Sequence, residues 1–219
     1  MTRRNRIDPW GDLHAVSERG MFTGNRGCLV DDHGEVVRHN RGRLWIACET
    51  EYRDWRVPLA RPGRWTPIFF LDEAVALAAG HRPCGLCRRD AYQSYRDAVS
   101  RAVNPGRPLG AEDLNRRLAS ERLRPGRGLE RAADRILWTS TIAALPVGTV
   151  IVHRSRGPQL LLEDRLLSFT FAGWEQPRPR PTSGEVPVLT PQTSVAALRH
   201  GFDPVLHPSA WGSETAGPG

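Results

Sequence analysis

Lysine is absent from this chain of 219 residues, and its 31 permanently basic side chains are all arginine. We interpret this as the arginine-for-lysine bias of a GC-rich coding sequence rather than as a functional signal. Long apolar runs are absent as well, since no stretch approaches the roughly 20 apolar residues needed to span a bilayer. No apolar segment of a signal peptide follows the charged N-terminus. These absences predict a cytoplasmic protein without membrane contact.

The positive charge is concentrated in one part of the chain. The formal net charge is +7. Residues 88–135 hold twelve arginines against seven acidic residues, a net of +5, so the rest of the chain contributes only +2. Clustered arginine is typical of phosphate binding, although an ordinary solvated helical face has the same composition.

Cysteine is scarce, and the four that occur predict a metal site. In a reducing compartment, cysteines indicate metal binding or catalysis rather than disulfides. Cys84 and Cys87 form a Cys-Gly-Leu-Cys turn before a predicted helix, whose positive end favours thiolates. A tetrahedral zinc needs two more ligands, and Cys28 and Cys48 lie at the two ends of a predicted hairpin. We therefore expect one structural Zn²⁺ bound by all four cysteines, with His81 as the main substitute for Cys28 or Cys48.

The pattern of apolar residues and turns predicts an α+β fold in three parts. The first is an N-terminal zinc-binding module over residues 1–103, with a β-hairpin from Gly27 to Ala47. The second is an arginine-rich helical connector over 104–140, and the third is a β-rich region over 141–211. A disordered tail is expected at 212–219.

Several elements are expected within these parts. A second strand pair is predicted at 52–59 and 65–70, followed by helices at 71–79 and 90–103. The connector should hold two amphipathic helices, at 111–123 and 129–138. In the third part we expect strands at 148–153, 159–163, 166–171 and 186–189, and a helix at 194–200.

One segment resembles a known family. Residues 70–88 read Phe-Leu-Asp-Glu-Ala-Val-Ala-Leu-Ala-Ala-Gly-His-Arg-Pro-Cys-Gly-Leu-Cys-Arg. This resembles the second half of the metal-binding domain of Ada-type DNA-repair proteins, in which a strand and an Ala-rich helix precede Arg-Pro-Cys, two residues and Cys. The resemblance implies that Cys84 and Cys87 bind zinc beside a surface that contacts nucleic acid. Because the Ada domain takes its other two ligands from cysteines four apart, and Cys28 and Cys48 are 20 apart, we interpret the zinc as structural rather than as a methyl-transfer centre.

Together these features predict a zinc-containing protein that binds nucleic acid, DNA rather than RNA, and acts in its repair or modification. The residues expected to contact phosphates are Arg82, Arg88, Arg89, Arg96, Arg116, Arg117, Arg124 and Arg127. The alternative is a nuclease- or glycosylase-type enzyme with a pocket between the zinc module and the β-rich region. Its candidate catalytic residues are His39, His81, Asp31 and His207. A protein-interaction scaffold is a third possibility, and it would scatter the arginines over the surface.

Overall fold

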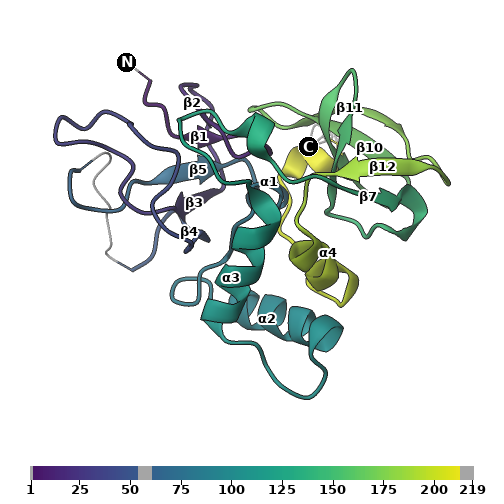
Figure 1. Cartoon of the computed structure of the whole chain (residues 1–219). Coiled ribbons are helices and arrows are strands. Elements are labelled where there is room, and N and C mark those ends of the chain that lie inside the picture. Colours follow the sequence, from purple (N-terminus) through teal and green to yellow (C-terminus); the bar gives the residue numbers. More distant parts are fainter. Residues whose placement is uncertain (1, 54–60, 213–219) are drawn as a thin grey trace, which may run out of the picture.

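The computed structural model describes residues 2–53 and 61–212, and over this part the chain is α+β as predicted. Two six-stranded sheets lie on either side of α1, with α2, α3 and α4 grouped below them in Figure 1. The helices are α1 (Glu73–Ala78), α2 (Arg89–Val103), α3 (Ala111–Arg122) and α4 (Gln192–Arg199). Short 3₁₀ turns occur at η1 (Ala132–Asp134), η2 (Ile142–Ala144) and η3 (Pro208–Trp211).

The first sheet is mixed and contains the N-terminal strands. These are β1 (Arg6–Ile7), β2 (Leu13–His14), β3 (Phe22–Asn25), β4 (Ile46–Glu49), β5 (Ile68–Phe70) and β6 (Arg82–Pro83). They lie side by side in the order β2-β1-β5-β3-β4-β6. The pairs β1–β5 and β4–β6 are parallel, and the others are antiparallel.

The second sheet is antiparallel throughout and confirms the β-rich region. Its strands are β7 (Trp138–Thr141), β8 (Val150–His153), β9 (Gly157–Leu161), β10 (Arg165–Phe169), β11 (Trp174–Pro179) and β12 (Glu185–Val188), in the order β11-β10-β9-β8-β12-β7. The four predicted strands are present, whereas β7 and β11 were not expected. The two prolines of β11 argue against a strand, but β11 lies at the sheet edge, where proline is tolerated.

The predicted hairpin at 27–47 is shifted along the chain. The strand that pairs with β4 is β3, which ends at Asn25, before Cys28 is reached. Gly27 then turns the chain with φ +94°, and a Cβ there would lie 2.7 Å from the carbonyl oxygen of Arg41. The residues after it form a small separate hairpin closed by a bridge between Val30 and Val36. The strand expected at 52–59 lies mostly outside the described residues, as does the tail from 213 onward.

The predicted helix at 129–138 is wrong. Only η1 is helical there, because the backbone around Arg135 pairs with the end of α3 through a bridge to Leu123. The apolar stripe that suggested the helix is not buried, since Leu137 is 38% exposed, whereas Arg131 and Arg135 are buried. Tertiary pairing and burial of arginine override the apolar spacing of this segment.

The two sheets share one core around α1. Every residue of α1 is buried, and the largest apolar cluster joins Phe70 of β5 to Trp174 of β11 and to Leu206 near the C-terminus. The N-terminal module and the β-rich region are therefore packed against each other rather than separated by the connector. Among the described residues, no helix is long and apolar enough to cross a bilayer.

Candidate metal centre

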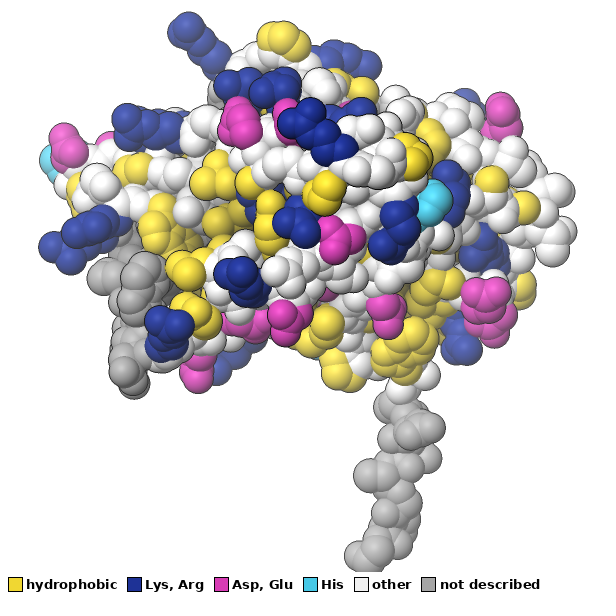
Figure 2. All heavy atoms as spheres, turned by 90° about the horizontal axis from the view of Figure 1, so that it is seen from below, with side chains coloured by type: hydrophobic (Ala, Val, Ile, Leu, Met, Phe, Trp, Pro, Cys, Tyr) yellow, Lys and Arg dark blue, Asp and Glu magenta, His cyan; other side chains and the backbone are white. Residues whose placement is uncertain are grey.

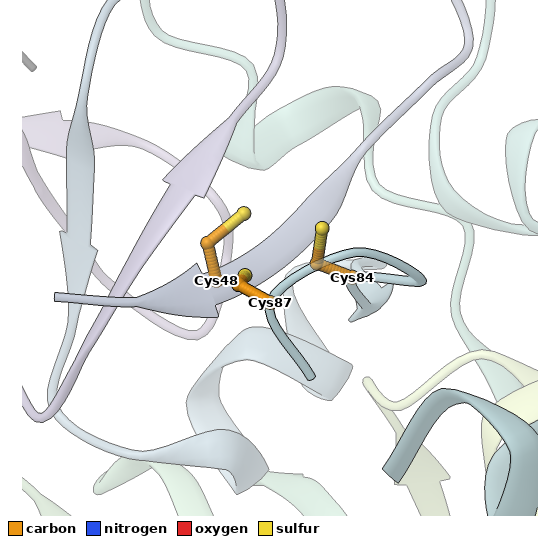
Figure 3. A group of neighbouring side chains, drawn as sticks. All are labelled: Cys48, Cys84 and Cys87. Atoms are coloured by element: carbon orange, nitrogen blue, oxygen red, sulfur yellow. The ribbon is translucent and has the colours of Figure 1, made fainter. Parts of the chain in front are cut away.

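Three cysteines come together where β4 meets the start of α2. Parallel pairing of β4 with β6 sets Ala47 opposite Pro83, and the N–H of Cys84 donates to the carbonyl of Ala47 at 2.9 Å. Cys48, the next residue of β4, therefore faces the turn that carries Cys84 and Cys87. Their three sulfur atoms all lie within 4.8 Å of one another (Figure 3).

The Cys84–Cys87 segment forms the predicted knuckle. The backbone N–H of Leu86 donates to Cys84 Sγ at 3.4 Å, so the turn is folded toward the sulfur. Cys84 is buried, and Cys48 and Cys87 are half-buried. The N–H of Arg88 closes the turn on the carbonyl of Cys84 at 3.1 Å, and α2 follows directly. The knuckle thus presents two thiol groups on one side, facing the third.

The three thiol groups differ in their tendency to ionise. Hydrogen bonds from Cys48 and then Cys87 hold the pKa of Cys84 far below its ordinary value. Hydrogen bonds to Cys84 and Cys87, together with burial, raise the pKa of Cys48. Ionisation of Cys84 is therefore favoured over that of Cys48, and a thiolate is the form that binds a metal ion.

The arrangement suits a soft or borderline metal ion. Zn–S bonds of about 2.3 Å in a tetrahedral site place sulfur atoms roughly 3.8 Å apart, which the present spacing reaches with small side-chain shifts. Three sulfurs and no carboxylate in the group favour zinc or another thiophilic ion over magnesium or calcium. The three cysteines are those that would hold the ion, and bound there it would tie β4 to the knuckle and to the start of α2.

Cys28 does not belong to this group, which corrects the four-cysteine prediction. The strand register sets Thr23, rather than Cys28, opposite Cys48. Beyond Gly27 the chain leaves the sheet, and the Cys28 thiol donates to the carbonyl of Val30 at 3.5 Å. No His, Asp or Glu of the described chain completes the group as a fourth member.

His81, the predicted substitute ligand, lies in the interior instead. Its Nε2 accepts a hydrogen bond of 3.1 Å from Nε of Arg26, and the ring is fully buried. Desolvation, followed by the charge of Arg26, lowers the pKa of His81 well below its ordinary value, so the ring is neutral. His39 contacts the same guanidinium, with its Nε2 3.1 Å from Arg26 Nη1.

Sequence reasoning missed this buried arginine cluster. Arg26 is fully buried and lies over the ring of Trp45 at 4.0 Å, and Arg122 lies over the same ring at 3.8 Å. Arg122 is 3% exposed and donates to the carbonyl oxygens of Gly80 and Arg43. Arginine usually lies at the surface and is rarely buried without a carboxylate partner. The residue type therefore predicts an exposed position for these side chains. The only sequence signal was the glycine on either side of Asn25-Arg26.

The four candidate catalytic residues are not brought together. His39 and His81 share the Arg26 guanidinium, whereas Asp31 lies in an exposed turn and accepts the N–H groups of His33 and Glu35. His207 lies in the C-terminal segment, where its Nδ1 pairs with the hydroxyl of Ser209 at 2.8 Å. The expected His/Asp pocket between the two regions is therefore not formed by these residues.

The predicted phosphate contacts divide into three groups. Arg82 and Arg88 are buried, which corrects their assignment: Arg82 donates to Asn115, and Arg88 pairs with Glu73. Two others have carboxylate partners, namely Arg96 with Asp97 and Arg116 with Asp113. The remaining four are exposed and have no carboxylate partner among the described residues: Arg89, Arg117, Arg124 and Arg127.

No protein-family model, curated protein or solved structure matches this chain.

Proposed function

We propose that this chain is a metal-containing protein that binds nucleic acid, DNA rather than RNA, in repair or modification. In this proposal Cys48, Cys84 and Cys87 hold a structural Zn²⁺. The resemblance of residues 70–88 to the Ada-type zinc module supports the assignment, since that module places its knuckle beside nucleic acid. The metal would fix the start of α2, and with it Arg89, the first residue of that helix.

The observation that carries the proposal is a set of unpaired arginines near the knuckle and along α3. Arg89, Arg117 and Arg124 are exposed, and none has a carboxylate within 4.0 Å among the described residues. An arginine without an internal partner keeps its whole charge for a phosphate. When it binds, it releases counterions that are condensed on the nucleic acid.

The arginines on the face seen in Figure 2 do not form one continuous patch. On the face seen in Figure 2, dark blue side chains are interspersed with acidic and apolar ones. Such a surface supports several separate phosphate contacts along a strand rather than one deep electrostatic groove. We therefore expect moderate affinity with a clear dependence on salt.

Binding of duplex and single-stranded oligonucleotides, measured by fluorescence anisotropy across a salt series, tests the proposal. For B-DNA, log K falls with log salt by about 0.9 per phosphate contact. The triple variant Arg89→Gln, Arg117→Gln, Arg124→Gln should reduce this slope by about 2 to 3.

The matched control removes the same number of charges from paired arginines. Arg96, Arg116 and Arg165 each have a carboxylate partner, so their replacement by Gln should change the slope by less than about 1. Absence of binding at low salt, a flat salt response, or equal effects of the two triple variants would contradict the proposal.

A further inference from the structure

A basic pocket lies between two loops, apart from the cysteine group. Its volume is about 320 Å³, and it is lined by Val37, Arg38, His39, Asn40, Gly126, Arg127, Gly128 and Arg131. Three of these residues are arginine, and none is acidic. The volume is at the lower end of the roughly 300–1,000 Å³ typical of small-molecule sites. The pocket is therefore suited in size and charge to a small anion.

Several hydrogen-bond donors in this pocket have no partner within the described chain. Arg127 is exposed, and its guanidinium makes no hydrogen bond there. Arg38 uses only Nη1, which donates to the carbonyls of Cys28 at 3.1 Å and Val30 at 3.4 Å, so its Nε and Nη2 stay available. The backbone N–H groups of Arg127 and Gly128 are likewise without a partner in the described part. Together these donors outnumber the two oxygens of a carboxylate and suit the several oxygens of a phosphate.

The loop of residues 126–128, which forms one wall of the pocket, is held by hydrogen bonds from the buried Arg131 side chain. Arg131 is 5% exposed, and its guanidinium donates to the carbonyls of Arg124 at 2.8 Å and Gly126 at 3.0 Å. A Cβ on Gly126 would lie 2.7 Å from Arg131 Nη2, so a larger residue there would have to displace this guanidinium. The loop is thus a built part of the fold rather than a loose connection.

Buried positive charge lies directly behind the pocket. His39 is 2% exposed, lines the pocket, and has its Nε2 3.1 Å from Nη1 of Arg26. The Arg26 Nη2 atom is buried without a hydrogen-bond partner. The facing carboxylates are Asp12, whose Oδ1 is 3.6 Å from His39 Nε2, and Asp134, which is paired with Arg131. Because buried charges are poorly screened, the charge of Arg26 adds to that of the three arginines that line the pocket.

We propose that this pocket binds a phosphate monoester group, supplied either by a free nucleotide or by the 5′ end of a nucleic-acid strand. Arg127 and Arg38 hold the phosphate oxygens, the backbone N–H groups of residues 127 and 128 add further donors, and Arg131 shapes the loop. The strand-end source rests on the proposed nucleic-acid function, whereas the free-nucleotide source is independent of it.

Calorimetric titration of the full chain with a nucleoside 5′-monophosphate, and with the same nucleoside lacking the phosphate, tests the proposal. We expect saturable binding of the monophosphate and much weaker binding of the nucleoside. Arg127→Gln should weaken monophosphate binding by roughly tenfold or more, because it removes a charge-assisted hydrogen bond. Arg127 has no internal partner, so this variant should fold normally.

Arg156→Gln is the matched control, since Arg156 is also exposed and unpaired among the described residues but lies in the β8–β9 turn. It should leave monophosphate binding unchanged. No saturable binding, equal binding of the nucleoside, or equal effects of Arg127→Gln and Arg156→Gln would overturn the proposal.

Two further arms identify the source of the phosphate. A 5′-phosphorylated oligonucleotide that binds more tightly than its 5′-hydroxyl counterpart, with the difference lost in Arg127→Gln, supports a strand end. Saturable monophosphate binding with equal affinity for the two oligonucleotides supports a free nucleotide. The triple variant at Arg89, Arg117 and Arg124 should leave monophosphate binding intact, which separates this pocket from the oligonucleotide surface.

Discussion

The indole N–H of Trp174 donates a 2.6 Å hydrogen bond to Oδ2 of Asp72, which joins the second sheet to the start of α1. The same oxygen accepts the backbone N–H of His207 at 3.0 Å, and Oδ1 accepts that of Val75 at 3.0 Å. Asp72 is fully buried, and this burial raises its pKa. One carboxylate therefore holds a helix start, a sheet edge and the C-terminal segment together.

Replacing Asp72 should destabilise the whole fold. Asp72→Ala leaves two buried donors and one half-buried donor without an acceptor, each worth about 1–3 kcal/mol, so we expect a loss of about 3 kcal/mol or more in the free energy of unfolding. Asp72→Asn keeps one acceptor oxygen and should lose less. Urea denaturation measures both, and a loss below about 1 kcal/mol for Asp72→Ala would show that these hydrogen bonds contribute little.

Arg88 should behave as a structural residue rather than as a phosphate contact. Its guanidinium pairs with Glu73, which is 1% exposed, and with Glu49 at 3.1 Å. Arg88→Met should cost about 3–5 kcal/mol, because it leaves Glu73 charged and buried. The N–H of Val205 donates to Glu73 Oε2 at 3.1 Å, and a glutamine oxygen can still accept it. The double variant Glu73→Gln, Arg88→Met should therefore be more stable than Arg88→Met alone. A double variant no more stable than the single one, measured by urea denaturation, would argue against this ion pair.

Zinc binding should require Cys48, Cys84 and Cys87 but not Cys28. Cys48→Ser, Cys84→Ser or Cys87→Ser should each lower the zinc content after dialysis, measured by plasma mass spectrometry, and should destabilise the fold because metal binding is linked to folding. Cys28→Ser is the control and should retain zinc. A purified wild-type protein without zinc, and indifferent to chelator, would refute the metal site. Loss of zinc in Cys28→Ser would restore the four-cysteine prediction.

The ion pair of His14 with Asp8 makes the free energy of unfolding depend on pH. Its hydrogen bond to Asp8, at 2.9 Å, is the main reason why the pKa of His14 is raised above its usual 6.5. The folded state therefore binds this proton more tightly than the unfolded chain does. The contribution of this proton to the free energy of unfolding is fully present below pH 6.5. It is lost as the pH rises through the raised pKa that His14 has in the folded state.

We expect His14→Gln to flatten the pH dependence of the urea midpoint between about pH 6 and about pH 8. His200→Gln, at an exposed ring, should not change it. If His14→Gln and the wild type show the same dependence, the pair with Asp8 does not contribute.

The sequence predicted those parts of the fold that depend on local signals. Asp72 at the N-cap, the alanines of α1 and Gly80 after it give α1 without reference to the rest of the chain. The spacing of Cys84 and Cys87 likewise predicted the knuckle, because the turn itself sets the direction of both sulfurs. Short apolar runs separated by turn residues identified the four inner strands of the second sheet.

The predictions that were wrong concern elements whose position depends on contacts between residues far apart in the sequence. Strand register decides that Thr23 rather than Cys28 faces Cys48, and sequence spacing alone does not fix register. The second connector helix, at 129–138, was wrongly predicted for a related reason, since Arg131 and Arg135 are buried and donate to backbone carbonyls. The partners of Arg135 lie in other segments and those of Arg131 in the loop just before it, so charge alone suggested a surface position for both.

Arg26 and Arg122 lie over the ring of Trp45, and at these two buried positions the choice of arginine over lysine has a structural reason. A planar guanidinium stacks on an indole and keeps its in-plane donors for backbone carbonyls, whereas a lysine ammonium has no plane to stack. Burial lowers the pKa of Arg122 to about 9. The pKa of lysine is ordinarily about two units lower than that of arginine, so a lysine there would be only partly protonated at neutral pH. Replacement of every arginine in this chain by lysine should therefore be tolerated at exposed positions. At the buried positions it should destabilise the fold.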